Sequence, residues 1–175
     1  MKNAYPEKPI LQFRRTSVEM LAAIKAIQDS TFPAEVKRAA YMIFRKESGN
    51  GRSGINENYS GFQADSGRWP IIYDPLIAGV VQKNENGTGK SRLFLAFHHV
   101  SGCLQMLMDR LQQRGIYIGG RTSKIVTMDV NNITDFARAY KKEWAAGKAS
   151  AEPTMEDIKG FDSMYRQAMG VLTDK

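Results

Sequence analysis

The chain has 175 residues, a length typical of one domain, and its hydrophobic fraction of 42% is enough for a packed core, which excludes a wholly disordered chain. Lysine and arginine total 25 against 18 acidic residues, so the net charge of +7 favours anionic partners, but no basic run indicates a nucleic-acid-binding arm and no nucleic acid is expected. The single cysteine excludes an internal disulfide, and no cysteine and histidine cluster has metal-ligand spacing, so we expect no metal and no other cofactor.

Residues 1–15 hold two prolines and little periodicity, which predicts an extended lead-in. They lack the continuous apolar run of a signal peptide, and no apolar stretch of the sequence is long enough to span a bilayer. We therefore expect a protein made in the cytoplasm without a signal peptide, with no membrane span, in which residues 1–175 form a single domain.

About five helices are predicted from apolar residues that recur at steps of three and four. The first follows Thr16, which stands three residues before Glu19 as in a capping box, and it runs to about Asp29. The second begins near Pro33 and carries an apolar stripe that reaches Glu47 on its last turn. A stop signal rich in glycine and asparagine then ends this helix.

The clearest helical stripe predicts a long central helix. The apolar residues from Val130 to Trp144 predict a fourth helix that ends near Gly147, and the fifth opens at Pro153 with Thr154 and Asp157 as a capping pair. Residues 76–82 fit either a short strand or one helical turn. The fold class is thus mainly α, or α+β, with about five helices around the central one. The central stripe consists of Leu93, Phe97, Val100, Leu104, Leu107 and Leu111.

Residues 49–75, after the second helix, are rich in glycine, asparagine, serine and aromatic residues. This composition predicts an irregular loop or a small hairpin. The segment is too long for a passive connection in a compact domain, and long loops of this kind tend to carry function.

Glu47 falls four residues after Ile43 on the apolar face of the second helix, next to this loop. Partial burial raises the pKa of a carboxylic acid, so such a group stays protonated and can donate a proton near neutral pH. Cleavage of a glycosidic bond needs such a donor, because the departing sugar oxygen is a poor leaving group until it is protonated. From position alone a solvated helix-end glutamate is the commoner case, so the interpretation depends on the residues that follow.

Two short motifs follow one another here: Glu47-Ser48-Gly49-Asn50 and Asn58-Tyr59-Ser60-Gly61-Phe62-Gln63-Ala64-Asp65. Together they resemble the lysozyme superfamily, and most closely the goose-type lysozymes and soluble lytic transglycosylases. In those families a helix ends in Glu-Ser, and a glycine step that leads to glutamine follows after a loop. Here the usual Gly-Leu-Met-Gln is shortened to Ser-Gly-Phe-Gln, and residues 50–58 form an unusual insertion.

The resemblance implies a lysozyme-like domain in which Glu47 is the general acid. Asp65 matches an aspartate that positions the attacking water in goose-type enzymes, and in that role hydrolysis with inversion is expected, with the two carboxyl groups about 6.5–9.5 Å apart. If Asp65 points into solvent instead, the lytic transglycosylase route remains. There Glu47 acts alone as acid and then base, and the 6-hydroxyl of muramic acid attacks to form an anhydro product.

The expected function is therefore peptidoglycan glycan-strand cleavage by a muramidase, at the cell wall, as a phage endolysin or virion-associated lysin. Anionic envelope polymers are further expected partners of the basic surface. The alternative is a catalytically inactive lysozyme-like protein that binds glycan or serves as a structural part of a virion. A nucleic-acid-binding module rests on the charge alone. The residues expected to contact sugar are Asn58, Tyr59, Ser60, Gln63, Trp69 and Tyr73.

Two other motifs are weaker. Residues 87–91, Gly-Thr-Gly-Lys-Ser, resemble the end of a phosphate-binding loop, but Asn84 stands where the pattern requires glycine. His98 and His99 lie one helical turn before Cys103, yet no second ligand pair accompanies them, so a packed or hydrogen-bonded histidine is the expectation.

Overall fold

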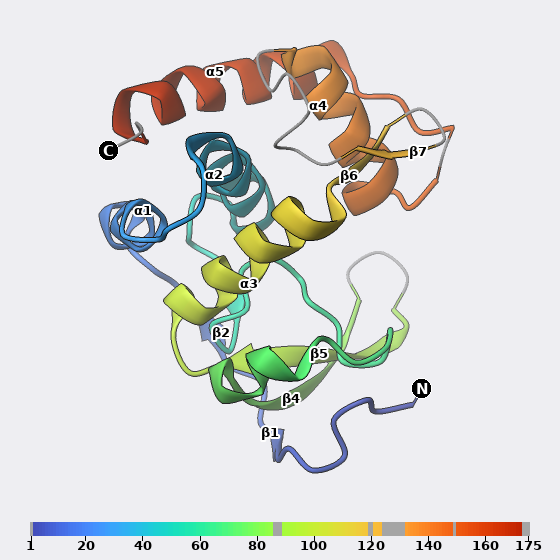
Figure 1. Ribbon diagram of the computed structural model, residues 1–175. Coiled ribbons are helices and arrows are strands. Elements are labelled where there is room, and N and C mark those ends of the chain that lie inside the picture. The colour runs from blue at the N-terminus through green and yellow to red at the C-terminus, as the bar shows by residue number, and fades with distance from the viewer. Residues whose placement is uncertain (1, 86–88, 119–120, 124–131, 149, 173–175) are drawn as a thin grey trace. The chain divides into compact units, whose positions relative to one another are not determined.

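The computed structural model describes residues 2–85, 89–118, 121–123, 132–148 and 150–172 (Figure 1). The chain divides into two compact units, Met1–Ala26 with Phe44–Met106 and Ile27–Ile43 with Leu107–Lys175. The broad prediction of a helix-rich α+β fold is confirmed, and its lysozyme-like kind stays a prediction, as does the single domain. The α-helices of the described residues are α1 (Met20–Gln28), α2 (Ala34–Ser48), α3 (Val100–Arg114), α4 (Ile133–Tyr140) and α5 (Met155–Val171).

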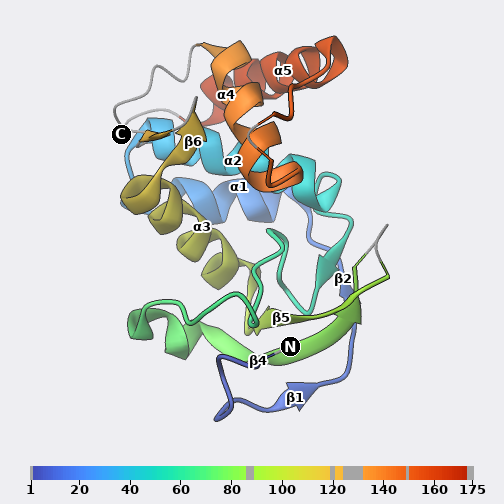
Figure 2. The ribbon, with the colours of Figure 1, turned by 90° about the vertical axis from the view of Figure 1, so that its right-hand side faces the viewer.

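The first unit is built on a three-stranded sheet of order β1-β4-β5, which Figures 1 and 2 show from two sides. Strand β1 (Ile10–Leu11) runs parallel to β4 (Ile77–Asn84), and β4 is antiparallel to β5 (Ser91–Phe97). The segment that fitted either a strand or a helical turn is thus largely strand, preceded by the 3-10 helix η1 (Ile71–Leu76). Because β4 lies in the middle, β5 has one side that faces no strand of this sheet.

The prediction of a helix that begins at Leu93 is wrong. Residues 91–97 form β5, and α3 begins only at Val100. The spacing of Leu93 and Phe97 fits a helix, but every residue between them is apolar and buried as well. A continuous apolar run of this length is typical of a strand that is covered on both faces, and its pairing with β4 decides between the two periodicities.

The N-terminal lead-in is part of the first unit. Tyr5 is fully buried, and the amide of Ala4 donates to the carbonyl of Ala64 at 2.9 Å. At Gly79, a Cβ atom would lie 2.7 Å from the carbonyl oxygen of Pro9, so glycine is what allows β4 to approach the lead-in this closely.

The predicted capping box of Thr16 and Glu19 is also wrong. Thr16 belongs to β2 (Arg15–Thr16), which pairs antiparallel with β3 (Gly54–Ile55). Its hydroxyl accepts a hydrogen bond from the amide of Glu57 at 3.0 Å, and α1 starts at Met20 without it. A long-range partner therefore competes successfully with the local cap.

The second unit has its core among α4 and α5. The ring of Phe161 contacts Phe136 and Tyr140 edge-on, with centroids 5.3 and 5.0 Å apart. Asn132 caps α4 by accepting from the amide of Asp135, and the helix continues as the π-helix η3 (Lys141–Ala145). A short hairpin of β6 (Ile116–Ile118) and β7 (Arg121–Ser123) completes the unit. Val130, the predicted start of this helix, lies outside the described residues.

None of the described helices combines the length and the apolar character needed to cross a membrane.

The predicted cap of α5 is confirmed as a capping box, in which Thr154 accepts from the amide of Asp157 and Asp157 accepts from the amide of Thr154. We expect Thr154→Ala to lower the free energy of unfolding by about 1 kcal/mol, because an orphan amide at the helix start loses its acceptor. Urea denaturation measures the change. Thr154→Ser keeps the oxygen and should stay close to the original protein, and equal stability of Thr154→Ala would contradict the assignment.

Candidate functional site

The predicted general acid lies on the last turn of α2. Glu47 is half-buried, and Ser48, the next residue, is fully buried and ends the helix. The Ser48 hydroxyl donates to the carbonyl of Phe44 and accepts from the amide of Gly51 at 2.8 Å. Asn50 takes a φ of +60° after the helix, and its side chain accepts from Arg45 at 2.6 Å. The helix end, and with it the backbone of Glu47, is thus held by side-chain hydrogen bonds.

Asn58 anchors the loop that follows. Its side chain is buried, and its Nδ2 donates to the carbonyls of Phe62 at 2.8 Å and Leu95 at 2.9 Å. Its Oδ1 accepts from the amides of Phe62 at 3.1 Å and Ser60 at 3.3 Å. These four bonds take up both donors and both acceptor sites of the amide, so no capacity is left for the sugar that the sequence analysis assigned to it.

Tyr59 and Ser60 lie inside the protein. The Tyr59 ring is 2% exposed and meets Phe44 edge-on at 5.7 Å, and burial raises the pKa of its hydroxyl to about 12. Ser60 is also buried, with its hydroxyl 3.7 Å from Cys103 Sγ. Neither side chain presents a free face to a sugar. Tyr73, in η1, is buried too.

Of the three aromatic residues that the sequence predicts to contact sugar, Tyr59, Trp69 and Tyr73, Trp69 is the one that keeps part of its side chain exposed. Its ring stands edge-on to Phe62, with centroids 5.0 Å apart, and its amide donates to the hydroxyl of Tyr5 at 2.9 Å. The N-terminal segment therefore helps to place Trp69. A half-exposed indole held in this way suits stacking on a sugar face.

Residues 62–64 cover the side of β5 that faces no strand of the sheet. The amide of Leu95 donates to the carbonyl of Phe62 at 2.9 Å, and the amide of Ala64 donates to the carbonyl of Leu93 at 2.7 Å. Phe62 and Ala64 are buried, whereas the side chain of Gln63 between them is half-buried. This alternation turns Gln63, and Asp65 after it, toward another residue of β5.

That residue is Arg92, which the sequence analysis missed. Arg92 Nε and Nη2 donate to the two oxygens of Asp65 at 2.9 and 3.0 Å, and the amide of Leu93 donates to Asp65 at 3.2 Å. Burial alone would raise the pKa of this carboxyl, whose side chain is only 5% exposed, but the hydrogen bonds from Arg92 and Leu93 outweigh it and the pKa lies below its usual value. Asp65 thus points to a guanidinium instead of solvent.

The two weaker motifs do not gain support. Gly89 and Lys90 belong to the turn that joins β4 to β5, and a strand follows them where a phosphate-binding loop requires a helix. Residues 86–88 of that motif lie outside the described part of the chain. His98 and His99 are exposed, so the expectation of packed histidines is wrong. Cys103, the third residue of this motif, is buried, and burial raises the pKa of its thiol to about 11. Within the described residues, no cluster suits a metal ion.

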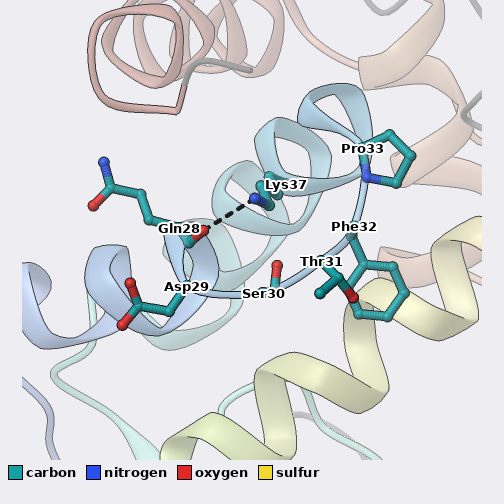
Figure 3. A pocket seen from close by; sticks show the side chains of 7 residues that line it. All are labelled: Gln28, Asp29, Ser30, Thr31, Phe32, Pro33 and Lys37. Carbon is teal, nitrogen blue, oxygen red and sulfur yellow. Dashed lines mark hydrogen bonds between the residues drawn. The ribbon is translucent and has the colours of Figure 1, made fainter. Parts of the chain in front are cut away.

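A separate hollow lies in the second unit, in the turn between α1 and α2 (Figure 3). Figure 3 shows the amine of Lys37 directed at the carbonyl of Gln28, which accepts its hydrogen bond at 3.0 Å. The hollow contains none of the predicted site residues. It is lined by Gln28, Asp29, Ser30, Thr31, Phe32, Pro33 and Lys37.

No protein-family model matches the chain, and no curated protein matches it. Among solved structures, a peptidoglycan hydrolase mutant from Sphingomonas sp. A1 is similar at 19% identity, over 83% of this chain and 98% of that one, with a TM-score of 0.42. A likeness of this degree carries no conclusion about the reaction of this chain. Membership of the lysozyme superfamily stays a prediction from the motifs around Glu47.

The Asp65–Arg92 pair should make stability depend on pH. Because the folded-state pKa of Asp65 lies below its usual 3.8, the carboxylate stabilises the fold above that pH, and the contribution is lost as the pH falls through the lowered value. We expect the stability difference between the original protein and Asp65→Asn to be largest near neutral pH and to shrink below about pH 4. Urea denaturation at several pH values measures it.

Asp162→Asn, at an ion pair on the surface of α5, is the matched control and should show a small difference throughout. A difference for Asp65→Asn that stays constant from neutral to acid pH would contradict the ion-pair assignment.

Proposed function

We propose that this protein cleaves the glycan strands of peptidoglycan, with Glu47 as the proton donor. The observation that carries the proposal is the placement of Glu47, half-buried on the last turn of α2, directly before a serine whose hydrogen bonds hold the helix end. The Glu-Ser and Gly-Phe-Gln motifs around it support the same function. Gln63 and Trp69 are the proposed sugar contacts, since both side chains are partly exposed.

In the proposed reaction, Glu47 acts in two steps. In the first step the carboxylic acid gives its proton to the glycosidic oxygen, so that the C–O bond breaks to leave a neutral alcohol. In the second step the carboxylate takes a proton from the nucleophile that attacks the anomeric carbon. A rigid backbone favours both steps, because the acid must stay within hydrogen-bond distance of the same small region throughout.

Asp65 has a different place in this proposal from the one first expected. Both of its oxygens accept hydrogen bonds from Arg92 or Leu93, which leaves little capacity to hold a water molecule. We assign it to holding the loop. This favours the route in which Glu47 acts as acid and then base, and the 6-hydroxyl of muramic acid is the nucleophile that closes the anhydro ring.

The surplus of basic residues supports action at the cell wall, where anionic envelope polymers would retain the protein. A phage endolysin or virion-associated lysin is the kind of protein that we propose.

Glu47→Gln should abolish clearing of peptidoglycan in a zymogram, with activity lowered at least about 100-fold, because an amide cannot donate the proton. Glu156→Gln, an exposed glutamate on α5, makes the same change of charge and should leave activity unchanged. Equal clearing by Glu47→Gln would sink the proposal. Peptidoglycan binding without any turnover by the original protein would show an inactive glycan-binding protein instead.

Asp65→Asn separates the two routes. If Asp65 holds the loop, Asp65→Asn should be less stable than the original protein. At a temperature where the variant is folded, its activity should stay within about tenfold of the original activity. Mass spectrometry should show anhydro ends on the products. If Asp65 positions water, the activity of Asp65→Asn should fall about as far as that of Glu47→Gln. The products released by the original protein should then have the mass of hydrolysed fragments, with one water added at the cut bond.

A further inference from the structure

Arg92 joins more than Asp65. Its Nη2 also donates to Gln63 Oε1, and the Ser66 hydroxyl, at 3.2 Å, is a third acceptor that shares the two hydrogens of Nη2, while Nη1 donates to Glu85 at 3.2 Å. The guanidinium is about one-third exposed, whereas Asp65 beneath it is nearly covered. One side chain of β5 therefore holds three residues of the loop segment 63–66.

These contacts decide which way the Gln63 amide faces. Arginine has only donors, so the atom of Gln63 that meets Arg92 must be the carbonyl oxygen. The Ser66 hydroxyl donates to the same oxygen, which fills its two acceptor sites. In the part of the chain that the structure describes, nothing accepts a hydrogen bond from Gln63 Nε2. The side of Gln63 that remains for a ligand is a pair of N–H donors.

We propose that Arg92 is a positioning residue, which turns the Nε2 donors of Gln63 toward an acceptor oxygen of the bound glycan. The acceptor is the carbonyl oxygen of an N-acetyl group, which cannot itself donate a hydrogen bond. This inference rests on the proposed function for the identity of the ligand. Without the guanidinium the amide is free to rotate, so it would present its oxygen as often as its donors and bind an acceptor less well.

The test uses the chemistry of the amide. In Gln63→Glu, one carboxylate oxygen keeps the bonds to Arg92 and Ser66, and the charge strengthens the bond to Arg92. The other oxygen stands where the donors were and now meets an acceptor. We therefore expect an unchanged or higher melting temperature, while the sacculus concentration that gives half-maximal cleavage rises about 10- to 100-fold, since an acceptor left without its donor is costly.

Gln82→Glu is the matched control, because it makes the same change at an exposed glutamine of the β4–β5 hairpin. It should leave the half-saturating sacculus concentration unchanged. Cleavage by Gln63→Glu that saturates like the original protein would overturn the inference. If Gln63→Glu does not fold, Gln63→Met removes the donors without adding charge, and saturation like that of the original protein would overturn the inference equally.

A double-mutant cycle tests whether Arg92 acts through Gln63. A lysine has no second nitrogen with which to reach Asp65 and Gln63 together, so Arg92→Lys should weaken binding about tenfold in the original background. In the Gln63→Met background the same change should have little further effect. Equal weakening in both backgrounds would show that Arg92 does not act through Gln63.

The Gln63 and Arg92 variants are also combined with Glu47→Gln, and their binding is measured by sedimentation with purified sacculi. This measurement distinguishes failure of the proposed function from failure of the inference. If the original protein does not cleave but Gln63→Glu lowers sedimentation, the proposed function fails and the inference stands. If cleavage depends on Glu47 but Gln63→Glu behaves like the original protein, the inference alone fails. If the original protein does not cleave and neither it nor Glu47→Gln sediments with sacculi, both are overturned.

Discussion

The attachment of residues 58–65 to the outer side of β5 is the constraint on which the candidate site depends. Backbone hydrogen bonds join Phe62 to Leu95 and Ala64 to Leu93, and the buried amide of Asn58 adds a bond to the carbonyl of Leu95. An exposed strand edge leaves unpaired amides and carbonyls, and the loop satisfies them. These bonds attach the loop after Glu47 to the sheet, although the loop contains little regular structure.

Backbone strain accompanies this attachment. Asn50, Asn56 and Glu57 all have positive φ angles, a region in which non-glycine residues are uncommon. The strain at Asn56 is offset by contacts with the N-terminal segment, because its side chain accepts from the amide of Arg14 at 2.7 Å and donates to the carbonyl of Gln12 at 3.0 Å. The lead-in thus stabilises the loop from one side while β5 holds it from the other, and such clusters of strain are common beside functional sites.

The sequence predicts features formed by residues within one helical turn better than hydrogen bonds between residues far apart in the chain. The capping box at Thr154 and Asp157 was predicted and is present, because both of its partners lie within one turn. Thr16 and Glu19 have a similar local pattern, yet Thr16 bonds to Glu57, 41 residues away. The spacing of Leu93 to Phe97 predicts a helix, and only the pairing of β5 with β4 shows that the segment is a strand.

The same division holds within the candidate site. From the sequence alone it followed that Glu47 lies at the end of an amphipathic helix before a long glycine-rich loop, since helix periodicity and stop signals are local properties. Only the tertiary structure decided that Asn58, Tyr59 and Ser60 are buried, and that Asp65 and Gln63 both meet Arg92. Nothing near Arg92 in the chain indicates these partners, which lie 27 and 29 residues away and become neighbours only when the loop covers the edge of the sheet.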